Sequence, residues 1–516
     1  MFQASSNIGK IKLIGRFVLI IGSILEIILF PAFKNFLWCL LFLYSWFLFE
    51  KFVFKNENFK RYLLPTLAVS GNILMYAFLP LIVTLIEIKP VTFNFEVPFD
   101  LCAYQAINIT VIIAAYALCI SVYKPDNILV KVWAKIGFFT PPTDKQIWTF
   151  AFICLGVFIF NSLTFSEAVD GIDGVVASAE GGGIASAFQG LFKACLLIPV
   201  CLFFKNFYGS YEKRDNKVLF LAFFFVIVIC SIITTRRRYI FEVALAFFIL
   251  YCLKNIVFSN RQFVNAKRML LLLAAFFVIG GPVSNLAIAM AVVRNMGETH
   301  SLRQVLDLYN DKEKMYAIKQ IYTTSNEVGG NKNGWSEYYV DNALLDRFCN
   351  LRVQDATLFY AEKLGFDNPV MHKYMEDRLS TLVPGVLANL GGLEKRGEST
   401  PADLMESEYV FSGLVRYAGN KVTGHLGAGL YWLGFKYYPV AFVIYFALFY
   451  FFCSCVYTKN AQLIIPVIVL CQMKLYFMWF VNGYGIITSL ETILRNGVQL
   501  IVFYCLVMFL VKKLVR

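Results

Sequence analysis

The sequence predicts an all-α, polytopic membrane protein with about twelve transmembrane helices and one large, mainly helical loop. Hydrophobic residues fill 59% of the 516 positions and charged residues only 16%, far from the ordinary composition of a soluble domain. Apolar stretches of about 20 residues recur along the chain, the length at which a helix crosses ~30 Å of hydrocarbon. The bilayer is therefore the expected solvent of this chain.

The apolar stretches divide the chain into three parts. Residues 1–293 hold the first nine expected spans and residues 438–516 hold the last three, with a polar segment at 294–437 between them. The expected spans cover residues 13–31, 35–53, 63–88, 104–123, 146–163, 187–206, 217–235, 238–258, 268–293, 438–457, 461–481 and 496–514.

Lysine and arginine set the expected orientation, because cationic loops are retained in the cytoplasm. These residues collect after the second, fourth, sixth and eighth spans and at the C-terminus, whereas the intervening loops are acidic or nearly neutral. We therefore expect both termini in the cytoplasm and the 294–437 loop on the outer face. The net charge of +13 follows from these loops, and no basic, aromatic surface suited to nucleic acid accompanies it.

The cysteines predict neither disulfides nor a metal site. Most of the 13 lie inside apolar runs, where a thiol behaves as a small hydrophobe. Only Cys349 lies in the large polar loop, and no Cys/His spacing is typical of a metal site.

A run of three arginines breaks the charge alternation. Arg236, Arg237 and Arg238 lie between the seventh and eighth spans, which the alternation places on the outer face. Guanidinium groups match phosphate oxygens in bidentate geometry, so the run indicates a phosphate or diphosphate site. Two alternatives stay open. In one, the seventh and eighth spans are a hairpin that has been divided at the wrong residues; in the other, the arginine side chains extend to the phosphates of membrane lipids.

The 294–437 loop has the composition of a folded region, with balanced charges and scattered aromatic residues. A helical pattern at 341–364 carries Arg347 and Arg352, and either arginine can bind substrate or simply pair with Asp346 or Asp355.

Two further cations of this loop, Lys395 and Arg396, lie in a glycine-bounded turn. They are candidates for substrate binding, and a solvated charge pair is the alternative interpretation.

A glycine-rich segment leads into the tenth span and contains His425, one of only three histidines in the chain. Small residues let a ligand approach the backbone, and an imidazole can exchange a proton near neutral pH. His425 is therefore the candidate acid–base residue, with a plain interfacial hydrogen bond as the alternative.

Some ionisable residues fall within the apolar runs, notably Glu26, Lys193, Glu242 and Lys474. Such groups are costly in hydrocarbon and usually face a cavity or one another. Glu242 follows Arg238 by four residues, a spacing that favours an ion pair on one helix face. Glu26 and Lys474 can equally mark a transport path.

These features resemble the O-antigen and capsule repeat-unit polymerases of bacterial inner membranes, and more distantly the O-antigen ligases. The similarity consists of the many spans, the arginine turn at 235–238, the outer loop after it, and the segment Thr423-Gly424-His425 that feeds the next helix. Ligases typically carry Asn directly after the histidine, and Leu426 stands there in this chain.

The resemblance implies a metal-independent glycosyltransferase, without a cofactor, in the bacterial inner membrane. Its substrates would be undecaprenyl-diphosphate-linked oligosaccharides as donor and acceptor, delivered within the membrane lipid, and a chain-length regulator protein is a possible partner. Arg236, Arg237 and Arg238 would bind the diphosphate, and His425 with Arg347 would act on the acceptor. An acidic base is an alternative to the histidine.

Two other function classes stay open from the sequence. A transporter or flippase of a lipid-linked sugar would have repeated halves or interrupted helices, and Gly280-Gly281-Pro282 can interrupt the ninth span. A membrane acyltransferase would need a histidine inside a span, which none of the expected spans contains.

Overall fold

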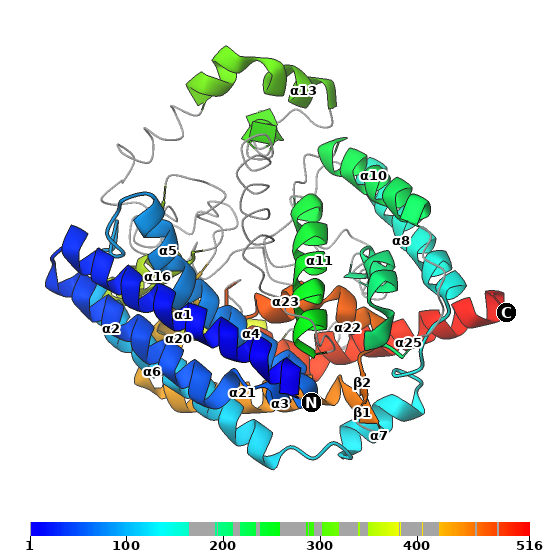
Figure 1. Cartoon of the computed structure of the whole chain (residues 1–516), viewed down its shortest axis with the longest axis horizontal. Coiled ribbons are helices and arrows are strands. Elements are labelled where there is room, and N and C mark those ends of the chain that lie inside the picture. Colours follow the sequence, from blue (N-terminus) through cyan, green and yellow to red (C-terminus); the bar gives the residue numbers. More distant parts are fainter. Residues whose placement is uncertain are drawn as a thin grey trace.

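The computed structural model contains helices almost throughout the part of the chain that it describes (Figure 1). The described residues are 2–164, 191–192, 194–209, 217–233, 238–257, 285–286, 288–290, 292–293, 302–318, 339–340, 349–380, 382, 405, 423–459, 462–481 and 485–515.

The first half of the chain builds long apolar helices. Helix α1 (Phe2–Leu29) precedes α2 (Phe33–Leu48), and a π-helical turn extends α2 to Val53. After α3 (Asn56–Arg61), helices α4 (Leu63–Ile73) and α5 (Leu79–Ile86) join through a second π-helical turn. The helices that follow are α6 (Pro98–Val122), α7 (Ile128–Lys135), α8 (Asp144–Thr164), α10 (Lys217–Ile233) and α11 (Arg238–Val257).

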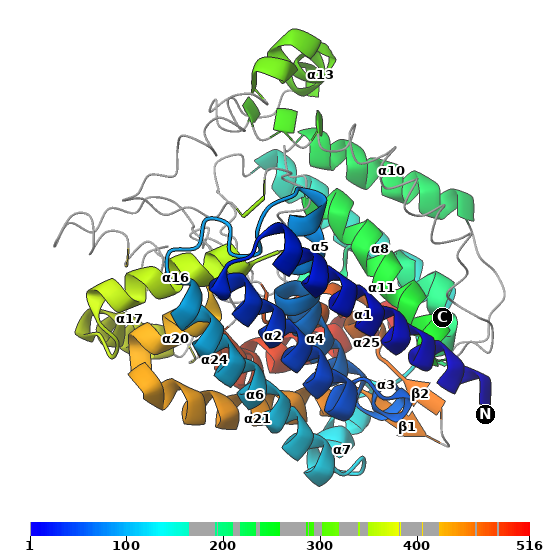
Figure 2. The same ribbon diagram turned by 60° about the vertical axis from the view of Figure 1, so that its left-hand side comes forward.

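The polar segment contributes shorter helices. These are α13 (Leu302–Asn310), α16 (Leu351–Leu364) and α17 (Pro369–Ser380). Next comes α20 (His425–Leu433), and a 3-10 turn at Gly434–Lys436 leads from it into α21 (Tyr437–Ser454). Figure 2 shows α16 and α17 lying beside α20. The expected helical character of the loop is thus confirmed where the structure describes it.

Two expected spans differ from single helices. Residues 461–481 form strand β2 (Gln462–Ile464) and two short helices, α22 (Val467–Cys471) and α23 (Met473–Phe477), so the expectation of one continuous span was wrong. The described end of the 187–206 span is a 3-10 helix, Ile198–Phe207, with a kink at Phe204. The apolar composition of these two segments predicted a membrane-spanning helix for each. A broken, buried segment has the same composition as a span, so the sequence pattern does not distinguish the two.

The chain ends in one long helical run. Helix α24 (Ile486–Glu491), a π-helical turn at Thr492–Asn496 and α25 (Gly497–Leu514) follow each other without interruption. Strand β2 pairs antiparallel with β1 (Tyr457–Lys459).

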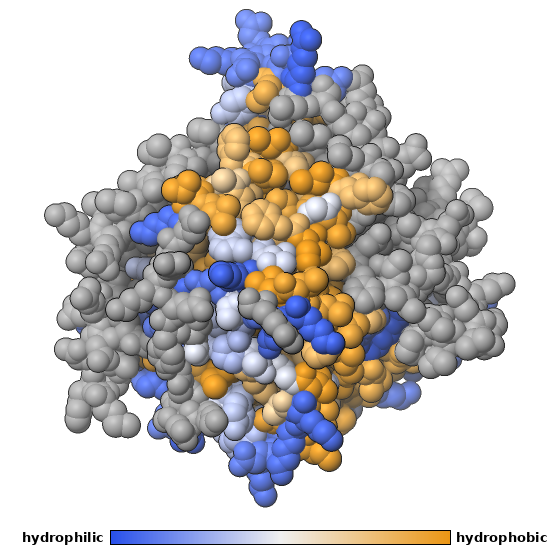
Figure 3. All heavy atoms as spheres, turned by 90° about the vertical axis from the view of Figure 1, so that its right-hand side faces the viewer, coloured by the Kyte–Doolittle hydropathy of each residue, from blue (hydrophilic) through white to orange (hydrophobic). Residues whose placement is uncertain are grey.

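The membrane character of the chain is confirmed. Within the described residues, five helical runs are long and apolar enough to cross a bilayer: Phe33–Val53, Leu63–Ile86, Pro98–Val122, His425–Ser454 and Ile486–Leu514. Most of the expected ninth span, 268–293, lies outside the described residues, so twelve spans stay a prediction. On the face shown in Figure 3, hydrophobic residues gather between hydrophilic ends. Helix α10 has exposed apolar side chains at Val218, Leu221 and Phe225.

Three described segments expected in the cytoplasm meet at one face, which we call the basic face. The Trp133 indole donates to Ser454 (3.2 Å), and the Phe139 and Tyr457 rings lie 5.4 Å apart, so α7 reaches the end of α21 and the hairpin. Near the C-terminus, Lys512 lines the same small cleft as Ile136. These three segments therefore lie together, as expected for one side of the membrane, whereas residues 210–216 and 258–267, after the sixth and eighth expected spans, lie outside the described residues.

Three described segments expected outside meet at a second face, which we call the α16 face. The Tyr339 hydroxyl donates to the Val91 carbonyl (2.6 Å), and the Asn350 amide donates to the Val481 carbonyl (2.7 Å). The polar segment is thus seated on the membrane helices through the loop between α5 and α6.

Candidate functional site

Glycines let α20 lie directly against α16. A Cβ added to Gly427 would meet the Leu358 nitrogen at 2.8 Å, and a Cβ on Gly424 would lie 2.8 Å from the Gln354 Cα. The Gly424 N–H donates to the Thr357 hydroxyl (2.8 Å). Any larger residue at Gly424 or Gly427 would push the two helices apart, so the glycine-rich segment serves close packing.

His425 lies at the start of α20 in a buried polar network. One ring nitrogen, Nδ1, lies 3.0 Å from the Gln354 amide, and the other, Nε2, lies 3.0 Å from the Asn108 amide on α6. Gln354 also donates to the Tyr76 hydroxyl (3.1 Å), which donates to the Phe480 carbonyl (2.9 Å). The network therefore joins α6, α16 and α20 with the segment after α23.

Both ring nitrogens of His425 face side-chain amide nitrogens. A neutral imidazole donates from one nitrogen and accepts at the other. Gln354 donates to Nδ1, because its amide nitrogen also donates to Tyr76, whose own proton is used on Phe480. At the other nitrogen, Nε2, the Asn108 amide nitrogen lies 3.0 Å away, and the Asn108 oxygen accepts from the Tyr437 hydroxyl (3.3 Å).

Burial limits what His425 can do in this arrangement. The residue is 1% exposed, and neutral amides engage both of its ring nitrogens. A general base needs a nitrogen within hydrogen-bond reach of the proton that it takes. His425 would reach a substrate only after one of these amides moves away, so the described geometry favours a positioning role.

Arg352 belongs to a charged cluster at the α16 face. Its guanidinium pairs with the Asp355 carboxylate (2.5 Å) and lies 3.6 Å from the Glu96 carboxylate. Asp355 also accepts from the N–H groups of Glu96 (2.8 Å) and Val97 (3.0 Å), just before α6 begins. The alternative given for Arg352, a structural pair with Asp355, is the one present here.

The Asp355 carboxyl is a perturbed acid. Burial raises its pKa to about 6, although the Arg352 charge and the two backbone N–H groups lower it. On the same helix, burial and then the charges of Asp100 and Asp355 raise the pKa of Glu362 to about 7. A carboxyl that titrates near neutral pH is suited to proton transfer. The seven-residue spacing of Asp355 and Glu362, typical of one helix face, is the signal that could have shown this pair in the sequence.

Several predicted site residues lie outside the described part of the chain. They are Arg236, Arg237, Arg347, Lys395 and Arg396, whose roles stay predictions. Helix α11 begins at Arg238, whose side chain is not among those that the structure describes.

Three of the four intramembrane residues have partners in the structure. Lys474 of α23 donates to the Glu242 carboxylate of α11 (2.9 Å). The Glu26 carboxylate accepts from the Val91 N–H (2.7 Å) and is fully buried. The general expectation that such groups face each other is confirmed for Lys474 and Glu242.

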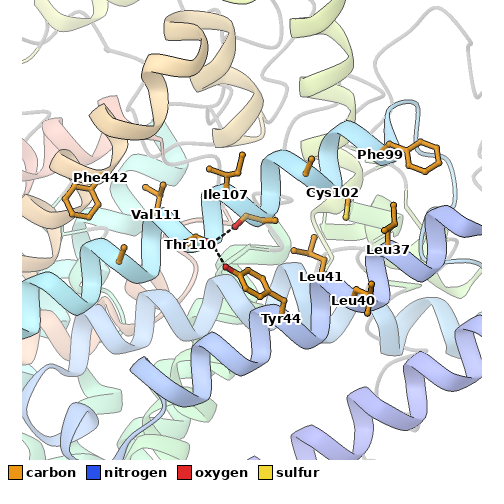
Figure 4. Close-up of a pocket in the computed structure, with 13 residues that line it drawn as sticks. Leu37, Leu40, Leu41, Tyr44, Phe99, Cys102, Ile107, Thr110, Val111 and Phe442 are labelled. Carbon is orange, nitrogen blue, oxygen red and sulfur yellow. Dashed lines mark hydrogen bonds between the residues drawn. The ribbon is translucent and has the colours of Figure 1, made fainter.

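An open apolar groove of about 710 Å³ runs between α2 and α6 (Figure 4). Its polar groups include Tyr44 and Thr110, whose hydroxyls lie 2.8 Å apart. Phe99, in the first turn of α6, lines one end and Phe442 of α21 the other (Figure 4). The Phe99 end lies within one turn of Val97 and hence of the Asp355 cluster.

Comparison of the chain with protein-family models, curated proteins and solved structures finds no match. Among the residues that the structure describes, no three His, Cys, Asp or Glu side chains gather closely enough to hold a metal ion. Metal independence stays a prediction. The function therefore has to be argued from the layout and geometry of the chain itself.

Proposed function

We propose that this protein polymerises undecaprenyl-diphosphate-linked oligosaccharide repeat units into a surface polysaccharide such as O-antigen or capsule. It acts as a metal-independent glycosyltransferase at the periplasmic face of the bacterial inner membrane. Both termini lie in the cytoplasm, so the basic face is the inner one and the α16 face is the outer one.

The observation that carries the proposal is the meeting of three features at the α16 face. A helix of the polar loop, α16, is packed against membrane helices through α20. Its charged cluster around Arg352 and Asp355 lies at the start of α6, and the apolar groove begins within one turn of it. The substrate consists of a saccharide, a charged linker and a lipid tail, in that order. The polar loop, the charged cluster and the apolar groove provide an environment for each of these parts in the same order.

The groove suits the polyprenyl chain of the substrate. It is lined by apolar side chains and opens on the membrane-facing surface, where Leu40 is 47% and Ile107 44% exposed. An isoprenoid tail presents methyl-branched hydrocarbon with no polar group, so it matches this lining. A tail in the groove would bring its diphosphate to the outer end of α6.

The diphosphate linker of the substrate determines the reaction that we propose. Glycosyl transfer breaks the bond between the anomeric carbon and a diphosphate oxygen, and the diphosphate leaves with the electron pair. Arg236, Arg237 and Arg238 would neutralise that charge without a divalent cation. Arg347, Lys395 and Arg396 would orient the saccharide chains.

A lipid-linked sugar transporter is the second candidate, and one observation favours it. Helices α22 and α23 are short and separated at Gln472, and this broken segment carries the Lys474–Glu242 pair. Interrupted helices with intramembrane charges are typical of transporter binding sites. An O-antigen ligase is a further alternative and would use the same outer face.

Deletion of the protein from its host separates these functions. A polymerase mutant should accumulate lipid that carries a single repeat unit in the outer leaflet of the inner membrane. A transporter mutant should hold that unit in the inner leaflet, and a ligase mutant should hold long polymer on the lipid carrier. Unchanged polymer on the cell surface would refute all three.

A further inference from the structure

An exposed histidine with a carboxylate partner lies at the α16 face. The His372 Nε2 is 2.7 Å from the Asp367 carboxylate, and the Lys436 ammonium is 3.4 Å from the other oxygen of that carboxylate. The His372 side chain is 38% exposed, and that of Lys436 is 77% exposed. The hydrogen bond to His372, followed by the Lys436 contact, lowers the pKa of Asp367, so the carboxylate is ionised at neutral pH.

A tight turn between α16 and α17 holds Asp367 in place. Gly365 (φ +90°) and Asp367 (φ +60°) both have left-handed backbone conformations. The Asn368 N–H donates to the Tyr431 carbonyl of α20 (2.9 Å), and the Asn368 side chain accepts from the Val370 N–H (2.9 Å) as α17 begins. A backbone fixed in this way sets the position of the carboxylate that orients His372.

Three aromatic rings lie next to these polar groups. Phe366 precedes Asp367, Phe435 precedes Lys436, and Tyr104 comes from α6. The three ring centroids are 5.9–6.0 Å apart, and Phe435 is 60% exposed. An exposed aromatic face beside hydrogen-bonding groups is suited to a pyranose ring, which has apolar C–H faces and polar edges.

The two histidines differ in what they offer a substrate. His425 is buried with both nitrogens engaged by neutral amides. In the neutral form of His372, a proton on Nε2 is donated to the Asp367 carboxylate, and the lone pair on Nδ1 is the accepting site. A base oriented by a carboxylate and open to solvent is the arrangement that general-base catalysis uses.

We propose that His372, Asp367 and the rings of Phe366, Phe435 and Tyr104 form the acceptor-saccharide site. This inference rests on the proposed polymerase function and assigns its general base. The terminal sugar of the acceptor packs on the aromatic rings, and its attacking hydroxyl points to Nδ1 of His372. His425 then acts as a positioning residue that holds α20 and α16 together.

The proton step balances as follows. The acceptor oxygen forms a bond to the anomeric carbon of the donor, and its proton moves to Nδ1 of His372. The bond from that carbon to the diphosphate breaks, and the diphosphate keeps the electron pair. The imidazolium, stabilised by Asp367, later returns the proton to solvent.

Chain growth in membrane vesicles from the deletion host, which hold the accumulated repeat-unit lipid, tests the base. With the full chain added back, His372→Ala should slow chain growth by about 100-fold or more, and added imidazole should restore part of the rate. Lys373→Ala, on the same helix and exposed, should behave as the unmodified protein. A His372→Ala protein with the unmodified rate overturns the assignment while leaving the polymerase function intact. A slow, normally folded variant that imidazole does not rescue would also overturn the role as base.

Sugar binding is measured separately from catalysis. Saturation-transfer NMR on the detergent-solubilised full chain, with free glucose, galactose, rhamnose and N-acetylglucosamine as probes, should give signals for at least one sugar. Phe435→Ala should abolish these signals, and Lys373→Ala should keep them. Absence of signal from every probe, or equal signals in Phe435→Ala, overturns the saccharide site. Because this readout needs no turnover, its failure is distinct from a failure of the polymerase function.

Discussion

The His425 imidazole and the Gln354 amide lie 3.0 Å apart and share a hydrogen bond inside the protein. Gln354 belongs to the helix α16 of the long polar segment, whereas His425 opens the helical run that continues into α21. The bond therefore ties the polar segment to a membrane-spanning run. The second amide partner of His425 is Asn108, which extends this connection to α6.

Loss of the Gln354 amide should destabilise the protein. Gln354→Leu leaves Nδ1 of His425 and the Tyr76 hydroxyl without this donor, and a buried group without its partner costs about 1–3 kcal/mol. Thermal unfolding in detergent should show a lower midpoint than the unmodified protein. Lys363→Ala, at an exposed position of α16, should leave the midpoint unchanged. An equal midpoint for Gln354→Leu and Lys363→Ala would contradict the network.

The close approach of α20 and α16 predicts a strong effect from a single methyl group. Gly427→Ala places a Cβ 2.8 Å from the Leu358 nitrogen and from a Thr357 methyl, so the helices must separate at a cost of about 1–3 kcal/mol. Gly156→Ala is the matched control, since a Cβ there meets nothing within 4 Å. In α8 that change should be neutral or stabilise by up to about 1 kcal/mol. The prediction fails if both glycine variants unfold at the same temperature.

Asp355 should make stability depend on pH in a defined window. Burial raises its pKa to about 6 in the folded protein, whereas an unfolded Asp titrates near pH 4. Between about pH 4 and pH 6 the folded state therefore binds more protons, so the free energy of unfolding falls as pH rises, by up to about 3 kcal/mol. Above about pH 6 this contribution no longer changes.

Asp355→Asn should remove that dependence. The variant cannot ionise, so its unfolding midpoint should vary less across the same pH window, even though it loses the ion pair with Arg352. Thermal unfolding of both proteins from about pH 4.5 to pH 8 checks this. Parallel pH profiles would show that another group is responsible.

Composition predicted the membrane class, because it depends on a sum over many residues. The expected outer loop at Glu96 and the polar segment do meet, at Asp355. The broken segment α22–α23 could not be predicted, because its apolar residues read as a span while tertiary contacts, such as the Phe477 carbonyl against Gly71, decide its path.

The candidate site, too, could be predicted from the sequence only in part. The glycine-rich segment around His425 was found because its composition is unusual, but its packing against α16 depends on a fold that spacing does not show. His372 stood in an ordinary helical pattern. Its partner is Asp367, whose other partner, Lys436, lies 69 residues further along the chain. The cluster of His372, Asp367 and Lys436 can be recognised only in the structure, where the turn places Asp367 between the other two residues.

The groove between α2 and α6 should be needed for a lipid-linked substrate. Ala106→Trp fills the space between the two helices, so chain growth in vesicles should fall at least about tenfold with unchanged protein in the membrane. Leu118→Trp is the control, because Leu118 is exposed on the same helix but does not line the groove. Equal chain growth in the two tryptophan variants would remove the groove from the proposal.

The Lys474–Glu242 pair distinguishes a structural role from a transport path. Lys474→Met takes the ammonium group away from the Glu242 carboxylate, so it should destabilise the protein more than the double variant Lys474→Met/Glu242→Gln. A double-mutant cycle of unfolding midpoints should give a coupling of about 1 kcal/mol or more. If the pair is structural, the double variant keeps normal chain growth in vesicles, because no charge is needed at this depth. Loss of chain growth in a stable double variant, with the repeat unit held in the inner leaflet, would instead support the transporter.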